Sequence, residues 1–282
     1  MNPEFYARAL LDRLSIAGVP DVRHIASTLG IAVRQRPLER CEGMLVRIKG
    51  TAKGVIAVKA SIREESRKRF TVAHELGHLL LPGHDDYGVC TSRVIESWAG
   101  EARDPEREAN VFAAELLMPT TILQRQLGSD APSLRLLDGI AATFGTSLTA
   151  SGYRFASLTP YAVALVWSEG GRIRWAKRSD EFGGWIRLRE KLDSRTFAAD
   201  LLGGVDVPPG AHRVPADAWL ERADADAFLI EESRLLPSYD AVLTLLWAKE
   251  VAGGGAAEDE LLEELNPSDF TSRRQRWPTR RR

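Results

Sequence analysis

The chain has 282 residues, and 44% of them are hydrophobic, which is enough for one large domain or two modest ones. Its 38 lysines and arginines nearly balance 39 aspartates and glutamates, so no global field attracts nucleic acid or an anionic membrane. No apolar run approaches the roughly 18 residues that span a bilayer, and charges at Glu4, Arg8 and Asp12 exclude a secretory signal near the N-terminus. We therefore expect a cytoplasmic protein without a membrane partner.

Residues 1–60 combine helical and strand patterns. An amphipathic helix is expected at the N-terminus, and a second, shorter helix over 21–29 ends at Gly30. β-forming residues then gather around 43–48 and 54–59, and they predict a small sheet. The sheet would directly precede the segment that carries the chemistry.

The pattern turns helical over 62–81, with Ser61 as the expected N-cap, and this helix contains H-E-x-x-H at His74, Glu75 and His78. Residues i and i+4 share a helix face, so both imidazoles can bind one ion at about 2.0–2.1 Å. Glu75 can take a proton from a metal-activated water. The alternative is a packed helix that contains two histidines by chance, because so short a motif recurs in unrelated chains.

A catalytic zinc site needs a third protein ligand and an open position. His84 stands where H-E-x-x-H-x-x-G-x-x-H has its third histidine. Leu81, however, occupies the glycine position of that pattern, where a turn with positive φ is needed.

The second candidate for the third ligand is Glu106, near the start of a helix expected over 105–118. Asn110 lies one turn further on the same face, where it can orient a ligand histidine. Stabilisation of the helix N-terminus is the non-functional explanation for an acidic residue here. Further alternatives for the third ligand are Glu108, Asp85, Asp86 and Cys90.

The second half of the chain has a different pattern of expected helices and strands. Residues 134–155 read as two short helices around Gly145, and 161–177 predict a β-hairpin with a Ser-Glu-Gly-Gly turn. Helices are expected between 180 and 202, and strands at 227–230 and 241–247. We therefore expect an α+β protein whose four segments are residues 1–130, 131–159, 160–252 and 253–282.

Positive charge in the second half is local. The helix pair over 134–155 carries only Arg135, Asp138 and Arg154, which is little for binding DNA phosphates and favours a structural or partner-docking role. A glycine run at 253–255 predicts a flexible linker, and the tail after it ends in an arginine-rich stretch. The simpler interpretation of this tail is a solvated, disordered end, and attraction of nucleic acid is the alternative.

Two segments together resemble the ImmA/IrrE family of metallopeptidases: R-F-T-V-A-H-E-L-G-H-L-L-L at 69–81 and E-R-E-A-N-V-F-A-A-E-L-L-M-P at 106–119. The resemblance implies a zincin-like peptidase domain. Within it, His74, His78 and Glu106 would be the zinc ligands and Glu75 the catalytic base. Asn110 would support the site. The sequence leaves open whether Mn²⁺ replaces Zn²⁺ in the cell.

Longer IrrE-like members of that family have the layout expected here. The resemblance implies a peptidase domain at 1–130, a helix-turn-helix segment at 131–159 and a GAF-like domain at 160–252 that senses a small molecule or docks a protein. The implied substrate is a helix-turn-helix transcriptional repressor, whose cleavage switches on a stress or mobile-element response.

Two other classes of function remain as alternatives. The first is a non-proteolytic, metal-stabilised transcription regulator that binds DNA through residues 134–155 and the basic tail. The second is a binding module with a purely structural zinc, which would require a fourth protein ligand to close the coordination shell.

Overall fold

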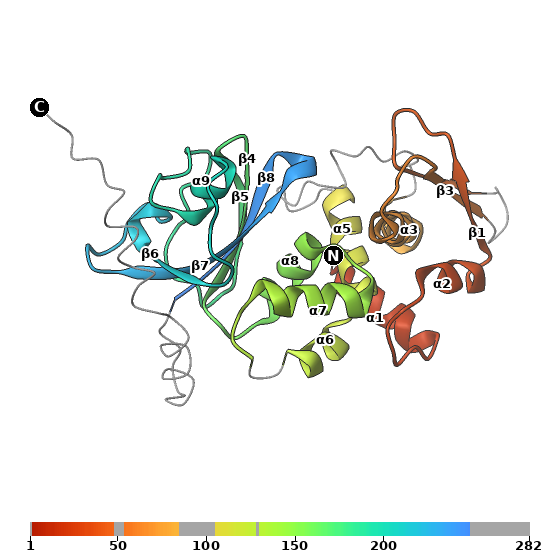
Figure 1. Ribbon diagram of the computed structural model, residues 1–282. Coiled ribbons are helices and arrows are strands. Elements are labelled where there is room, and N and C mark those ends of the chain that lie inside the picture. The colour runs from red at the N-terminus through yellow and green to blue at the C-terminus, as the bar shows by residue number, and fades with distance from the viewer. Residues whose placement is uncertain (1, 48–53, 85–104, 128–129, 249–282) are drawn as a thin grey trace, which may run out of the picture. The chain divides into compact units, whose positions relative to one another are not determined.

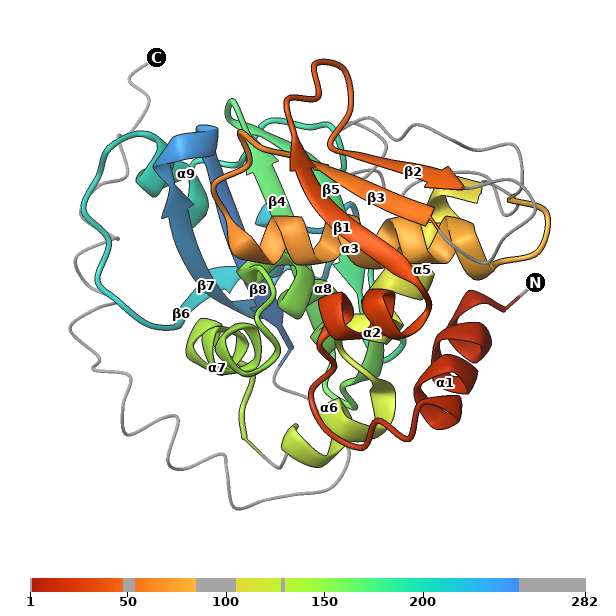
Figure 2. The ribbon, with the colours of Figure 1, turned by 90° about the vertical axis from the view of Figure 1, so that its right-hand side faces the viewer.

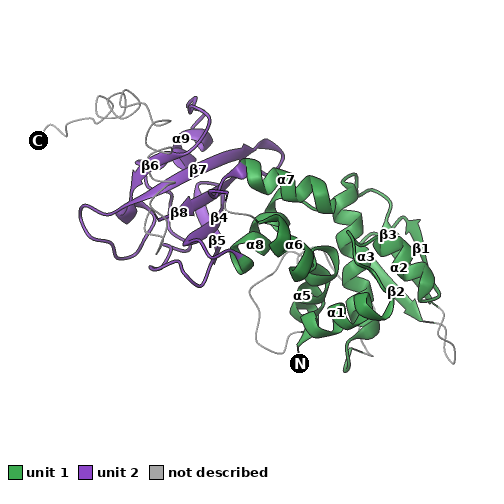
Figure 3. Ribbon diagram, turned by 90° about the horizontal axis from the view of Figure 1, so that it is seen from below, with its two compact units in different colours: residues 1–128, 135–158 green, residues 129–134, 159–282 purple. Residues whose placement is uncertain are grey.

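A computed structural model describes residues 2–47, 54–84, 105–127 and 130–248 (Figure 1). The chain divides into two units, which are coloured separately in Figure 3. The first comprises Met1–Gly128 and Arg135–Leu158, and the second comprises Ser129–Leu134 and Thr159–Arg282. Mixed helices and strands make the protein α+β. None of the helices in the described ranges is long and apolar enough to cross a membrane.

The first unit opens with two helices and a small sheet. Asn2 and Asp21 cap the two helices through their side chains, as short polar residues commonly do at this position. In the sheet, the strand order is β1-β3-β2, with β1 parallel and β2 antiparallel to β3. The sequence patterns did not indicate β1. The elements are α1 (Pro3–Arg13), α2 (Val22–Thr28), β1 (Ile31–Arg36), β2 (Gly43–Arg47) and β3 (Gly54–Lys59).

The motif helix α3 (Glu65–Leu80) runs across this sheet, as Figure 2 shows. It begins three residues later than expected, and Ser61 is not its N-cap. Residue Glu64 holds that position without a side-chain hydrogen bond. The reason is local, because the N–H of Ile62 bonds to the carbonyl of Lys59 and forms a turn that ends β3.

Helix α5 (Pro105–Leu117) packs along α3, with proline in its first position as expected. Three more helices complete the first unit, and the sequence patterns missed the first of these. They are α6 (Thr120–Gln126), α7 (Leu134–Phe144) and α8 (Leu148–Leu158). A turn with Gly145 at φ +62° separates α7 from α8.

A buried ion pair fixes α8 to α5. Arg154 donates to the carboxylate of Glu115, which also accepts from the backbone N–H and the hydroxyl of Thr120. Arg69 of α3 donates to the carbonyl of Phe144 at the end of α7. Arg154, one of the charged residues of the helix pair α7 and α8, is thus used for packing within the first unit.

The second unit is a five-stranded antiparallel sheet with the order β5-β4-β8-β7-β6. The predicted hairpin at 161–177 is confirmed, and its turn uses Gly170 and Gly171 at φ +56° and +70°. The sequence patterns did not indicate β6. The elements are β4 (Val163–Glu169), β5 (Arg172–Arg178), α9 (Phe197–Leu202), β6 (His212–Pro215), η1 (Ala216–Ala218), β7 (Phe228–Leu236), η2 (Pro237–Tyr239) and β8 (Ala241–Trp247).

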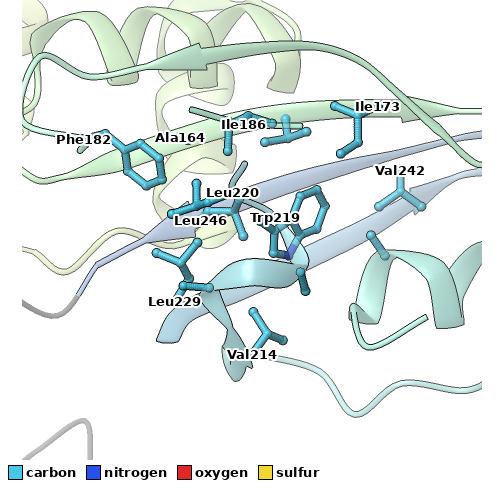
Figure 4. Packing of buried hydrophobic residues seen from close by; sticks show 14 residues of the cluster. Ala164, Ile173, Phe182, Ile186, Val214, Trp219, Leu220, Leu229, Val242 and Leu246 are labelled. Atoms are coloured by element: carbon cyan, nitrogen blue, oxygen red, sulfur yellow. The ribbon is translucent and has the colours of Figure 1, made fainter. Parts of the chain in front are cut away.

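The core of the second unit surrounds Trp219, which is fully buried among aliphatic side chains (Figure 4). Of the helices expected between 180 and 202, one forms, α9, and residues 180–196 are not helical. The backbone around Arg189 and Glu190 instead bonds to Ile173 on the edge of β5. Pairing with a strand distant in sequence therefore outweighs the local helical pattern.

Candidate metal centre

Two closely packed helices assemble the site in the first unit. Helix α3 carries His74 and His78, and helix α5 carries Glu106 and Asn110. The helices meet at Gly77, where a Cβ atom would lie 3.1 Å from the Cα of Ala109. A larger residue at Gly77 would push the helices apart, so this glycine sets the distance between the two pairs of polar side chains.

Three side-chain atoms converge between the helices. His74 Nε2 lies 3.1 Å from His78 Nε2 and 3.1 Å from Glu106 Oε2, and His78 Nε2 lies 3.5 Å from the same carboxylate oxygen. A tetrahedral zinc ion with bonds of about 2.0–2.1 Å separates neighbouring ligand atoms by about 3.4 Å. Because these atoms all offer lone pairs, the cluster needs positive charge at its centre, as shared protons or as a metal ion. The residues fit a divalent metal.

The outer nitrogen of His74 supports this arrangement. Its Nδ1 lies 2.9 Å from Asn110 Oδ1, and both side chains are fully buried. An amide oxygen only accepts, so His74 carries its proton on Nδ1 and keeps the lone pair of Nε2 for a metal.

Glu106 is held in its ionised form. Burial acts to raise its pKa, but hydrogen bonds with His74 and His78 outweigh burial and lower the pKa to about 2. The side chain is therefore a carboxylate at neutral pH, which is the state that metal ligation requires.

Glu75 lies against the sheet. A Cβ atom at Gly43 of β2 would stand 2.4 Å from Glu75 Oε1, so any side chain at position 43 would collide with the carboxylate. Glu75 itself is buried, with 1% of its surface exposed. Burial, and then the nearby charge of Glu75, raise the pKa of the Cys41 thiol, so Cys41 stays protonated.

His84, the other candidate for the third ligand, is not part of the converging cluster. Leu81 stays extended, and Gly83 at φ +80° turns the chain so that His84 lies beside His78. Its Nδ1 is 3.0 Å from His78 Nδ1, on the side of that ring away from His74, and its Nε2 is 3.0 Å from Glu108 Oε2. Burial lowers the pKa of His84 more than the Glu108 hydrogen bond raises it, which favours the neutral ring.

The remaining alternatives, Asp85, Asp86 and Cys90, lie outside the described residues, as does the arginine-rich tail. The sequence analysis missed Gly43 and Gly77, whose roles depend on close approach of other elements. A glycine inside a helical motif was the available signal for Gly77.

The chain is similar in sequence to known proteins over the region that contains this site. Residues 26–156 match the Peptidase_M78 family model, described as IrrE N-terminal-like domain. This part of the chain is therefore similar to the ImmA/IrrE family. The matched region contains His74, Glu75, His78, Glu106 and Asn110.

Two curated relatives are similar in sequence. The radiation response metalloprotease IrrE of Deinococcus radiodurans is 32% identical over 55% of this chain and 48% of that protein. The protein of the same name from Deinococcus deserti is 36% identical over 66% of this chain and 65% of its own length. The chain thus matches less than two thirds of either relative.

A solved structure shares the fold. A Mycobacterium tuberculosis transcriptional regulator superimposes on 87% of this chain and 75% of its own, with a TM-score of 0.51 and 15% identity. At this identity the likeness concerns architecture alone.

Proposed function

We propose that the chain is a zinc-dependent endopeptidase that cleaves a helix-turn-helix transcriptional repressor in the cytoplasm. The observation that carries this proposal is the convergence of His74 Nε2, His78 Nε2 and Glu106 Oε2 at spacings near those of a tetrahedral ion. Two imidazoles and one carboxylate suit zinc, whereas manganese prefers a set richer in oxygen.

The chemistry of the chain's own residues follows from this placement. Zinc, when bound, supplies Lewis acidity toward a peptide carbonyl and toward water. Glu75, next to His74 on α3, takes the proton of the attacking water and later gives it to the departing amine. His74, His78 and Glu106 together carry a net charge of −1, so they leave positive charge on the ion to act on the carbonyl.

Strand β2 supports a peptide as substrate. It lies at an edge of the described sheet and is held along α3, because Arg47 donates to the carbonyl of His78 at 2.6 Å and Glu42 forms an ion pair with Arg67. An extended chain can add to such an edge through backbone hydrogen bonds, which bind peptides without requiring one sequence. Gly43 on this strand lies against Glu75, so a substrate paired with β2 would pass close to the base.

The repressor as substrate and the sensory role of the second unit extend the family resemblance. The names of the two Deinococcus relatives describe a radiation response metalloprotease, in keeping with a peptidase that acts in a stress response. For the second unit, a GAF-like domain that receives a signal remains the proposal. Its support is a closed core of its own around Trp219.

A DNA-binding regulator that does not cleave is less well supported. Arg154, one of two arginines in the helix pair at 134–155, has only 6% of its side chain exposed and is paired with Glu115. Phosphate contacts from this helix pair would therefore depend mainly on Arg135. Tight, salt-sensitive DNA binding without any cleavage would reverse this preference.

The test uses Glu75→Gln, which keeps the size of the side chain but removes its basicity. Purified protein is loaded with Zn²⁺ or with Mn²⁺ and mixed with helix-turn-helix repressors of its own genome, beginning with those encoded beside it. We expect the wild-type zinc form to cleave one of them. The variant should bind zinc equally well but cleave about 10²–10⁴ times more slowly. Undiminished cleavage by the variant would remove Glu75 from the mechanism.

A further inference from the structure

The two ligand imidazoles have different partners on their outer nitrogens. His74 Nδ1 contacts the neutral amide of Asn110, whereas His78 Nδ1 contacts a second imidazole, His84. His84 in turn contacts the carboxylate of Glu108 through its other nitrogen. The line from Glu108 through His84 to His78 is continuous, with 3.0 Å at both contacts.

The protons in this line can be placed if His78 binds a metal through Nε2. Its single proton must then lie on Nδ1, where it is donated to Nδ1 of His84. His84 consequently carries its own proton on Nε2 and donates it to the carboxylate of Glu108. Both rings are neutral in this arrangement, and each N–H points at an acceptor.

We infer that His84, anchored by Glu108, is the positioning residue for His78 in the metal centre. The inference rests on the proposed metallopeptidase function, because the positioned group is a metal ligand. His84 fixes the rotation of the His78 ring and the site of its proton. Glu108 places a negative charge one ring away, which makes His78 a more basic ligand.

Burial and chain geometry support this role. His78 and His84 are 0% and 1% exposed, so water does not compete for the contact between the two rings. Glu108 lies on α5, the same helix that carries Glu106 and Asn110. A single helix thus carries one ligand and the polar groups that hold His74 directly and His78 through His84.

The test compares three variants of the full chain. His84→Leu removes the acceptor for His78. His84→Asn keeps an acceptor, because its amide oxygen occupies the position of the histidine Nδ1. Glu108→Gln removes the charge but retains a hydrogen-bonding group. His24→Leu, at an exposed histidine of α2, is the matched control.

Two readouts other than cleavage are measured for each variant. The first is the zinc dissociation constant, from competition with a chelating dye, and the second is the visible absorption of the Co²⁺-loaded protein. We expect His84→Leu to weaken zinc binding about 10–100-fold and to alter the Co²⁺ spectrum. Glu108→Gln should weaken it by less, while His84→Asn and His24→Leu should resemble the wild type.

The outcomes separate the alternatives. Unchanged zinc affinity and Co²⁺ spectrum in both His84→Leu and Glu108→Gln would overturn the inference. Equal loss in His84→Asn and His84→Leu would also overturn it, by making His84 a direct ligand. If His84→Leu fails to fold, Glu108→Gln decides alone, and unchanged zinc affinity and Co²⁺ spectrum in that variant would overturn the inference. A wild-type chain that binds no zinc would instead refute the proposed function itself.

Discussion

Glu106 in the first unit is a partly buried acidic side chain and Glu231 in the second is a fully buried one, and their surroundings differ. Glu231 accepts hydrogen bonds from Trp219 Nε1 at 3.0 Å, from the backbone N–H of Ala198 at 2.7 Å and from the hydroxyl of Ser233 at 2.9 Å. Glu106 faces two imidazole nitrogens that face each other as well. One carboxylate is surrounded by fixed donors, and the other belongs to a set of converging lone pairs.

This difference separates a polar cluster that stabilises the fold from one that could hold a metal ion. The donors around Glu231 belong to the fold and tie β7 to α9 and η1, so nothing further is needed to satisfy the carboxylate. At Glu106, three atoms that offer lone pairs converge, and positive charge from shared protons or a metal ion would balance them. The two sites differ in what faces the carboxylate: hydrogen-bond donors at Glu231, and imidazole nitrogens that also face each other at Glu106.

Removal of Glu106 should have the largest effect on the metal centre. Glu106→Ala takes away a ligand. We expect zinc affinity to fall by more than the about 100-fold that loss of a hydrogen bond to a ligand can cost, and we expect cleavage to be lost. The unfolding temperature of the wild type should rise on addition of Zn²⁺, and that of the variant should not. A control, Glu231→Gln, should bind zinc like the wild type. Retained zinc affinity in Glu106→Ala would place the third ligand elsewhere.

The buried pair of Glu115 and Arg154 provides a satisfied carboxylate within the first unit. Arg154→Met leaves Glu115 buried without its cation, so we expect unfolding to become easier by about 3–5 kcal/mol. Urea unfolding measures this loss. The control is Arg135→Met, at an exposed position of α7, which should change the free energy of unfolding by about zero. A loss no greater than that of the control would mean that water or another cation replaces Arg154.

Glu231→Gln should have a smaller effect. The N–H₂ group of the new amide would face a buried hydrogen-bond donor, and this should lower the free energy of unfolding by about 1–3 kcal/mol. Burial raises the pKa of Glu231 in the folded protein. The unfolded chain therefore releases this proton at lower pH, so the stability that Glu231 contributes is lost as the pH rises from about 4.3 through the pKa of the folded state.

The difference in stability between wild type and Glu231→Gln should accordingly narrow from acid to neutral pH. Chemical unfolding of the second unit at several pH values, followed through Trp219 and its neighbours, would test this. A difference that widens with pH would show that the donors around Glu231 hold it ionised, contrary to the expected direction.

The sequence predicted the elements whose patterns are local. Helices α3 and α5, the strands at 54–59 and 241–247 and the hairpin at 161–177 all carry clear periodicity or turn residues. Strand β1 has no such signal, because it forms by parallel pairing with β3. The segment after Arg178 was misjudged for the same reason, since its backbone bonds to the distant edge of β5.

For the metal centre, the sequence by itself determined the chemistry. H-E-x-x-H on a helix places two imidazoles on one face, and acidic residues on a second helix offer a third ligand, because helical spacing alone governs these relations. The tertiary structure determines which of the described candidates lies nearest the facing Nε2 atoms of the two histidines. Close approach at Gly77 brings Glu106 to the histidines, and the turn at Gly83 carries His84 to the outer side of His78. The position of Glu106 depends on how α3 packs against α5, and that of His84 depends on the turn after α3. The spacing of residues within one helix determines neither position.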